Sequence, residues 1–479
     1  MGTIRRIAKN TAVLTSSEVL NKVLSLFLYI AIANYLKDSG YGQFSFIITI
    51  LGFFQVIANF GLDKLTIREV SKAKEKTHQY VVSMLRFKFF LALLTYLILV
   101  IFINLTGKGP EVVYGVYLMG LTILFISLSN TYMAIFNAHE KLEINAILLV
   151  FIKLIILGLT FLGIYLKVGL LYILSFFVIG EAIRTIIFHF LYKKHFKISK
   201  ILKGNLLSKK TLIKAAPFAA IGVASLIYNH IDIVMLSLMK DDKAVGWYSA
   251  AYTLILGLMF IPRCYTLSIF PVLSRYARDS NRMLNFAWQK SIKMLLAISL
   301  PVSVGVYFLS ARFINLFYSS GSYARSSLAL QILMFAMPWI FINAINMYVL
   351  YAADKQKEAT LVVLVSTVIN IGLNFILIPK YSYIGAAWTT VAAEMINVCL
   401  FFWLISYLLK FRYKDIKSIL KVIISSAILG LFIYKFILLP LILIIVLSIA
   451  VYMILLLLMR YFDEEEFKII REVFSRKAK

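Results

Sequence analysis

The sequence is a succession of apolar runs, each about as long as a lipid bilayer is thick. A hydrocarbon core of about 30 Å takes about 20 apolar residues in a helix, and runs of this length recur from near residue 11 to residue 460, which predicts about 14 spans. Of all residues 61% are hydrophobic and only 15% charged, whereas soluble domains carry about 25% charged residues. We therefore expect an all-α polytopic membrane protein. The first run continues to about Tyr35 without a small-residue cleavage site, so we take it as a retained span.

Lysine and arginine gather on alternate connections between the runs. Cytoplasmic loops carry an excess of these residues, so the alternation places both termini in the cytoplasm of a cell-membrane protein. The net charge of +28 comes from clusters beside spans and not from one face of a polar fold, which argues against nucleic acid. Three cations near cytoplasmic span ends, Arg86, Lys88 and Lys293, are expected to reach the headgroups. The basic clusters lie at residues 64–76, 193–214, 275–282 and 410–417.

The chain also repeats itself. Gly42-Gln43-Phe44-Ser45 resembles Gly246-Trp247-Tyr248-Ser249, and Ala138-His139-Glu140-Lys141 resembles Ala352-Ala353-Asp354-Lys355. These matches fall at equivalent spans, so they predict two parallel six-helix lobes followed by two additional helices; chance similarity among apolar helices is the alternative. The predicted division is an N-terminal lobe at 1–192, a basic cytoplasmic linker at 193–214, a C-terminal lobe at 215–410, and two helices with a charged cytoplasmic tail at 411–479.

Polar residues mark the first two predicted spans of each lobe. Glu18 and Lys22 are four residues apart and so share one helical face. An ionisable side chain at membrane depth costs about 2.5–3.5 kcal/mol, so it needs an interior partner or a water-filled cavity. The further polar residues at these spans are Asn21, Ser25, Tyr29, Gln55, Asn59, Tyr228, Asn229, Asp232, Tyr252 and Arg263.

Two motifs carry a resemblance to a known family. Asp232 followed by Val245-Gly246-Trp247-Tyr248-Ser249-Ala250-Ala251-Tyr252, and Asn370, Asn374 and Ile378-Pro379 followed by Tyr383-Ile384-Gly385-Ala386-Ala387-Trp388-Thr389-Thr390 and Glu394, resemble signatures of polysaccharide-exporter flippases. That family includes the O-antigen flippases and belongs to the multidrug/oligosaccharidyl-lipid/polysaccharide flippase superfamily. The resemblance covers essentially the whole chain. It implies two lobes around a cavity that opens alternately to each side, with a polyprenyl-pyrophosphate-linked oligosaccharide as cargo.

The resemblance further implies that the first two spans of each lobe line the cavity. We therefore expect Lys22 and Arg263 to attract the pyrophosphate, since arginine is a good phosphate fork. Glu18 and Asp232 would balance these cations or carry a coupling H+ or Na+. The alternative is that Glu18–Lys22 and Asp232–Arg263 are structural ion pairs that lock helices together.

Other functions are weighed against this one. The chain has no P-loop, no nucleophile–base pair and no large water-facing loop, so we expect no enzyme activity and no cofactor. Cys264 and Cys399 both lie in apolar runs and form no metal-ligand spacing. A multidrug or small-molecule antiporter of the same superfamily and a peptidoglycan lipid-precursor flippase remain alternatives. We expect a monomer among membrane lipids, which could associate with glycan-assembly enzymes.

Overall fold

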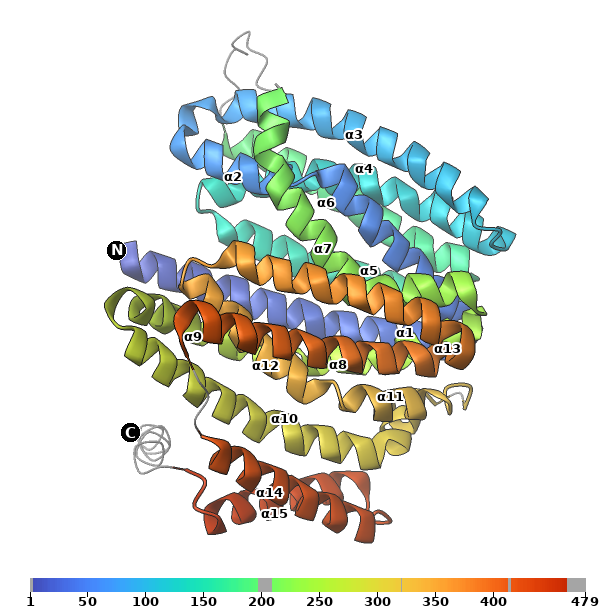
Figure 1. Ribbon diagram of the computed structural model, residues 1–479. Helices are drawn as coiled ribbons and strands as arrows, with labels where there is room; N and C mark the ends of the chain where they lie inside the picture. Colours follow the sequence, from blue (N-terminus) through green and yellow to red (C-terminus); the bar gives the residue numbers. More distant parts are fainter. Residues whose placement is uncertain (1–2, 197–208, 320, 412–414, 463–479) are drawn as a thin grey trace, which may run out of the picture. The chain divides into compact units, whose positions relative to one another are not determined.

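The apolar runs fold into long helices, because only a helix satisfies every backbone hydrogen bond within a single lipid-exposed segment. The computed structural model describes residues 3–196, 209–319, 321–411 and 415–462, and within them it contains helices and short connections but no strand (Figure 1). The predicted all-α membrane fold is confirmed. Residues 197–208 of the predicted linker and 463–479 of the predicted tail lie outside the described residues.

Eleven of the described helices are long and apolar enough to cross a membrane, or twelve elements if α11 and α12, which meet at a bend of 47°, count as one span. Two of them, α1 and α13, are interrupted by a single residue with non-helical backbone angles, Lys37 and Ser382 respectively. Of the 57 and 54 residues of α1 and α13, each side of the break keeps at least about 20, the length that crosses a hydrocarbon core. The expected total of 14 requires that both cross twice, and it stays a prediction.

The helices divide into two compact units. Unit 1 comprises residues 1–257 and 374–383, and unit 2 comprises residues 258–373 and 384–479. The lobes predicted at 1–192 and 215–410 follow the sequence repeat and remain a prediction. Unit 1 contains α1 (Thr3–Asn59), α2 (Leu62–Lys72), η1 (Lys74–Lys76), α3 (Thr77–Leu105), α4 (Pro110–Ala138), α5 (Leu142–Tyr165), α6 (Leu170–His195), α7 (Lys209–Met239) and α8 (Asp242–Leu258). Unit 2 contains α9 (Phe260–Asp279), α10 (Asn281–Phe317), α11 (Ser326–Met334), α12 (Met337–Ala352), α13 (Gln356–Leu409), α14 (Ile416–Lys435) and α15 (Leu441–Leu458).

The repeat reappears in the backbone. Glu140 after α4 and Asp354 after α12 both adopt a left-handed conformation, with φ of 59° and 58°. The residue that follows each of them closes the same turn, because Lys141 N donates to Phe136 O at 2.9 Å and Lys355 N donates to Leu350 O at 2.8 Å. The two aligned segments therefore share one helix-ending turn, which supports the internal repeat.

Two cations that were expected to reach the headgroups are buried instead. The Lys88 side chain is fully buried and forms an ion pair with Asp63 in the first turn of α2. Lys293 is 4% exposed, and its Nζ lies 4.8 Å from the centre of the Tyr461 ring. The prediction was wrong for both, because each ammonium has a partner in the protein that compensates its loss of water. Arg86 is exposed, and its contact with the headgroups stays a prediction.

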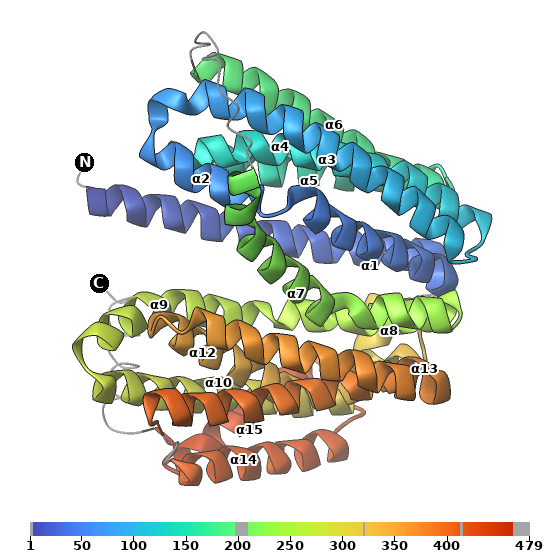
Figure 2. The same cartoon turned by 45° about the horizontal axis from the view of Figure 1, so that its top comes forward.

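In unit 2 the two last helices form a hairpin that packs along α10 (Figures 1 and 2). At the turn of the hairpin, Arg312 Nη1 donates to the carbonyl oxygens of Ile437 and Leu439 at 2.7 and 2.6 Å. Toward the other end, the Tyr452 hydroxyl donates to Ala297 O at 2.9 Å and the Tyr461 hydroxyl to Lys293 O at 2.7 Å. Both ends of the hairpin are thus fixed to α10.

Candidate functional site

All the predicted site residues except Arg263 lie in unit 1, on α1, α7 and α8. Glu18 and Lys22 lie one turn apart on the first arm of α1, which is the part before the break at Lys37, and both are exposed. Between them Asn21 accepts a hydrogen bond on its backbone oxygen from Ser25 Oγ at 2.7 Å. Tyr29 packs with its ring edge against Phe44, at 6.0 Å between ring centres. The first arm therefore presents its charges together, as the sequence predicts, and turns Tyr29 toward a packed aromatic neighbour.

On the described part of α1, three side-chain amides have an oxygen atom that accepts no hydrogen bond. Among the described residues, the side-chain oxygens of Asn21, Gln55 and Asn59 are buried and lack a hydrogen-bond partner. The Gln55 nitrogen, by contrast, donates to Ser127 Oγ on α4 at 3.3 Å. Asn21 and Gln55 lie about 24 and 27 Å from the break at Lys37 along the two arms of the helix. A buried acceptor without a donor costs about 1–3 kcal/mol.

A buried carboxylate links α7 with α8. Asp232 is 5% exposed and accepts hydrogen bonds from the Tyr248 hydroxyl at 2.9 Å and from Asn374 Nδ2 at 2.5 Å. Tyr248 and Asn374 belong to the motifs that carry the family resemblance, but sequence reasoning assigned neither to the site. Their common role is visible only when α7, α8 and residues 374–383 are brought together. Two neutral donors therefore hold this carboxylate in unit 1.

The remaining predicted aromatic and amide residues of α7 and α8 are tied to the backbone. The Tyr252 hydroxyl donates to Asn229 O at 3.1 Å, and Asn229 Nδ2 donates to Ser225 O at 2.6 Å. Tyr252 is 8% exposed and stacks on Tyr248 at 5.8 Å. In this conformation Tyr252 packs α8 against α7, whereas the neighbouring Tyr228 is half-buried.

The two repeated glycine motifs meet each other within unit 1. A methyl group on Gly42 would lie 1.8 Å from Asp242 O, and one on Gly246 would lie 1.9 Å from Asp38 O. The residues that follow the glycines cross over in the same way, with Gln43 Nε2 donating to Asp242 Oδ2 at 3.2 Å and Trp247 Nε1 donating to Asp38 Oδ2 at 3.1 Å. Both glycines are required because the two backbones approach too closely for a side chain. We call this contact the glycine seam.

In unit 2, Arg263 lies exposed in the first turn of α9, directly after the buried Pro262. The chain changes helix here, with α8 ending at Leu258 and α9 beginning at Phe260. Proline suits the first turn of a helix, because the amide hydrogen that it lacks has no partner there in any case. Pro262 thus lies in the first turn of α9.

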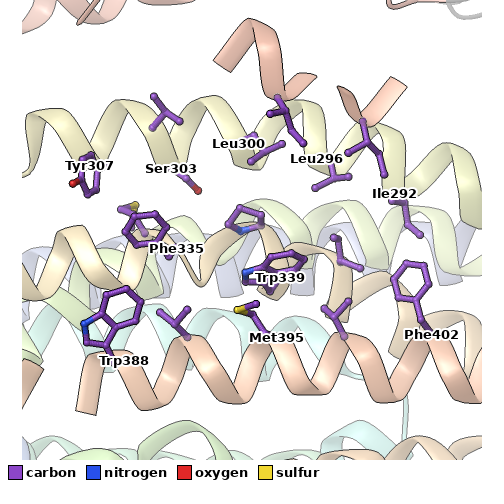
Figure 3. A pocket seen from close by; sticks show the side chains of 18 of the residues that line it. Ile292, Leu296, Leu300, Ser303, Tyr307, Phe335, Trp339, Trp388, Met395 and Phe402 are labelled. Carbon is purple, nitrogen blue, oxygen red and sulfur yellow. The ribbon is translucent and has the colours of Figure 1, made fainter. Parts of the chain in front are cut away.

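Unit 2 also contains an apolar chamber of about 870 Å³. Its walls come from α10, α11, α12, α13 and α14, and large aromatic and aliphatic side chains point into it (Figure 3). The residues that shape it most include Leu296, Leu300, Trp339, Trp388, Met395 and Phe402. No sequence signal marked this chamber, because each of these residues reads as ordinary span surface. Its size lies in the range of 300–1,000 Å³ typical of sites that hold drug-sized apolar ligands.

No group of three or more His, Cys, Asp or Glu side chains in the described part of the chain could hold a metal ion.

The sequence and the structure resemble those of known proteins. The family described as polysaccharide biosynthesis protein matches residues 7–277, and the MatE family matches residues 217–376. A protein named lipid II flippase MurJ from Bacillus subtilis is 23% identical over 89% of this chain and 87% of its own length. A putative O-antigen transporter from Shigella flexneri is 22% identical over 81% of this chain and 97% of its own length. These relatives are transporters and flippases, not enzymes.

Two further comparisons concern extent and fold. A membrane protein of Methanocaldococcus jannaschii is 25% identical over 219 residues, so this chain spans less than half (43%) of that relative's length. A solved structure of lipid II flippase MurJ in an inward closed conformation has a TM-score of 0.78 at 21% identity, covering 92% of this chain and 97% of that one. Since the first family covers more than half of the sequence, the chain belongs to the polysaccharide biosynthesis protein family, within the multidrug/oligosaccharidyl-lipid/polysaccharide flippase superfamily.

Proposed function

We propose that this chain is a flippase that moves a polyprenyl-pyrophosphate-linked oligosaccharide from the inner to the outer leaflet by alternating access, for the synthesis of cell-surface polysaccharide. The observation that carries the proposal is the polar stripe on α1, where the exposed Lys22 lies beside the donor-less oxygen of Asn21. A cation in an apolar helix is costly unless it faces water or an anion. A pyrophosphate supplies the anion, and sugar hydroxyls supply donors for the amide oxygens.

The apolar chamber of unit 2 supports the lipid part of the cargo. It is lined almost entirely by aliphatic and aromatic side chains over about 870 Å³. Each methylene group that leaves water for such a chamber contributes about 0.8 kcal/mol. Relatives named as an O-antigen transporter and a lipid II flippase are consistent with a lipid-linked cargo. We take both termini as cytoplasmic and the chain as a monomer.

Arg263 and the carboxylates complete the proposal. Arg263 acts with Lys22 as the second pyrophosphate-binding cation, and Asp232 is the candidate for coupling to H+ or Na+. The two hydrogen bonds from Tyr248 and Asn374 fix the orientation of this carboxylate. Glu18, one turn from Lys22, balances the charge of that cation when the cargo is absent.

The test is a transport assay in proteoliposomes with a labelled lipid-linked oligosaccharide. We expect the Lys22→Ala/Arg263→Ala double variant to insert normally and to lose most transport. Lys72→Ala/Arg278→Ala removes two exposed cations outside the site and should leave transport unchanged. Undiminished transport by the Lys22→Ala/Arg263→Ala variant would refute the proposed pyrophosphate site.

One rival has an observation in its favour, since the MatE family matches residues 217–376. A multidrug antiporter would move organic cations, and its transport would not depend on Lys22 or Arg263. A peptidoglycan lipid-precursor flippase would share the pyrophosphate site. Deleting the gene and identifying the lipid-linked intermediate that accumulates on the inner leaflet distinguishes the two flippase functions, and the absence of any accumulation would favour the antiporter.

A further inference from the structure

Unit 1 contains a cavity of about 430 Å³ that lies between α3 and α6 and has α4 as its floor. The two outer helices both pack along α4 (Figure 2). The floor consists of Leu128 and Tyr132, one turn apart on α4. The walls consist of Leu85 from α3 and of Thr185, Ile186, His189 and Phe190 from α6. We call this cavity the lateral groove.

The rim of the lateral groove faces outward, and its floor is covered. Ile186 and Phe190 on the rim are exposed, whereas Tyr132 on the floor is buried. The α6 helix is long and apolar enough to cross a membrane, so its exposed apolar side chains meet acyl chains. A chain that enters the groove contacts three helices at once, which distinguishes the groove from the general lipid-exposed surface of unit 1.

The predicted cytoplasmic end of the groove carries cations. Lys193 and Lys194 each follow a groove-lining residue of α6 by one turn, so they continue the face that lines the groove. Both lysines are exposed, and so is Arg86, the residue after Leu85 on α3. Among the described residues that line the groove there is no carboxylate. These charges favour an anionic head group over a zwitterionic one.

An imidazole lies between the apolar floor and the cations. The Tyr132 hydroxyl and His189 Nδ1 are 2.8 Å apart, and their rings meet edge to face at 5.9 Å. When the hydroxyl donates to Nδ1, the other ring nitrogen carries the hydrogen and can donate to an ester or phosphate oxygen. Because His189 lies one turn from Lys193, the imidazole and the ammonium are spaced to contact one lipid at its glycerol and its phosphate.

We propose that an anionic phospholipid of the inner leaflet binds in the lateral groove, with one acyl chain over Leu128 and Tyr132 and its phosphate at Lys193 and Lys194. The inference goes beyond the proposed function, because this ligand is a resident membrane lipid and not the cargo. The site therefore holds whichever cargo the chain moves.

The length of the groove fits a single leaflet. From Thr185 to Lys193 the α6 helix rises about 12 Å, and one leaflet contributes about 15 Å of hydrocarbon, half of the core. At the cytoplasmic end, His78 Nδ1 and the Tyr192 hydroxyl, 2.8 Å apart, already join α3 to α6. A lipid in the groove adds a second link between these two helices, so its binding should stabilise unit 1.

The experiment measures lipid binding to the full-length protein in a neutral detergent by native mass spectrometry. The probes are phosphatidylglycerol and phosphatidylcholine with identical acyl chains, and inorganic phosphate serves as a probe without a chain. Lys193→Gln/Lys194→Gln removes the head-group cations, and Ile186→Trp narrows the groove.

Each variant has a matched control in unit 1. Lys72→Gln/Lys76→Gln removes two exposed cations away from the groove, and Ile179→Trp introduces the same large side chain at an exposed position of α6 that does not line the groove. Both controls should bind lipid like the wild type.

We expect the wild type to bind phosphatidylglycerol more tightly than phosphatidylcholine. Lys193→Gln/Lys194→Gln should weaken the binding of phosphatidylglycerol about tenfold, which corresponds to about 1.4 kcal/mol, and should leave phosphatidylcholine unchanged. Ile186→Trp should weaken the binding of both lipids. Equal binding of phosphatidylglycerol by the lysine variant and its control would overturn the head-group site, and equal binding by the two tryptophan variants would overturn the groove as the place of the chain.

Thermal unfolding gives an independent readout, because a lipid that binds the folded state raises the unfolding temperature. Phosphatidylglycerol should raise this temperature for the wild type and both controls but not for Lys193→Gln/Lys194→Gln. The same rise with inorganic phosphate alone would indicate a site for free anions and would overturn the phospholipid assignment.

Discussion

Placing a methyl group in the glycine seam is the sharpest test of the backbone packing in unit 1. In Gly246→Ala the new carbon would lie 1.9 Å from Asp38 O, and in Gly42→Ala it would lie 1.8 Å from Asp242 O. Both neighbours are backbone atoms, so the two segments must move apart to reach even 3.0 Å. Such overpacking costs about 1–3 kcal/mol, and alanine returns about 0.5–1 kcal/mol through its higher helix propensity.

We therefore expect each variant to unfold at a lower temperature than the wild type, with a net loss of about 1–2 kcal/mol. The measurement is thermal unfolding of the purified protein in detergent, followed by tryptophan fluorescence. Gly158→Ala on α5 is the matched control, because nothing lies within 4 Å of its added carbon, and it should equal or exceed the wild type in stability. If Gly42→Ala and Gly246→Ala were as stable as this control, the close approach of the two segments would be refuted.

Three further predictions concern single groups. Asp63→Asn leaves the buried Lys88 ammonium without a carboxylate, so we expect the free energy of unfolding to fall by about 3–5 kcal/mol in the same measurement. Adding Lys88→Met should restore most of this loss. An unchanged unfolding temperature of Asp63→Asn would count against the ion pair. At His139, which follows α4 and contacts Thr77 Oγ1 at 2.8 Å, burial first and the nearby lysines second lower the pKa of the imidazole below its usual value. Stability is then full above about pH 6.5 and falls as the pH drops below that value, and His139→Gln should lose less stability than the wild type between pH 7 and pH 5; equal losses would contradict this. Asp232→Asn keeps the size of the side chain but removes its charge, so we expect transport in proteoliposomes no longer to respond to an imposed proton or sodium gradient, whereas an unchanged response would exclude this residue from coupling.

The fold class could be predicted from the sequence because lipid imposes a strict rule on composition and length. Apolar runs of bilayer length must be helices, and the repeat was visible because Ala138-His139-Glu140-Lys141 resembles Ala352-Ala353-Asp354-Lys355. The break within α1 was predicted to within a few residues, because the first apolar run ends near Tyr35 and the backbone leaves the helical conformation at Lys37.

The candidate site was predictable only where one helix carries it. The stripe of Glu18 and Lys22 follows directly from helical spacing. The partners of Asp232 come from α8 and from residues 374–383, more than a hundred positions further along the chain in the case of Asn374, and no local pattern connects them. Lys88 was misjudged for a similar reason: its partner Asp63 lies on a different helix.

The attachment of the last two helices has a consequence for how the protein can move. Arg312 of α10 donates a hydrogen bond to the turn of the hairpin, and at the opposite end Tyr452 and Tyr461 donate hydrogen bonds to backbone oxygens of α10. These hydrogen bonds hold the three helices together, so a tilt of one helix moves the other two with it. A lipid chain bound in the apolar chamber beside α10 would move together with these helices during each transport cycle. The chain would then stay bound while only the hydrophilic head group crosses the membrane.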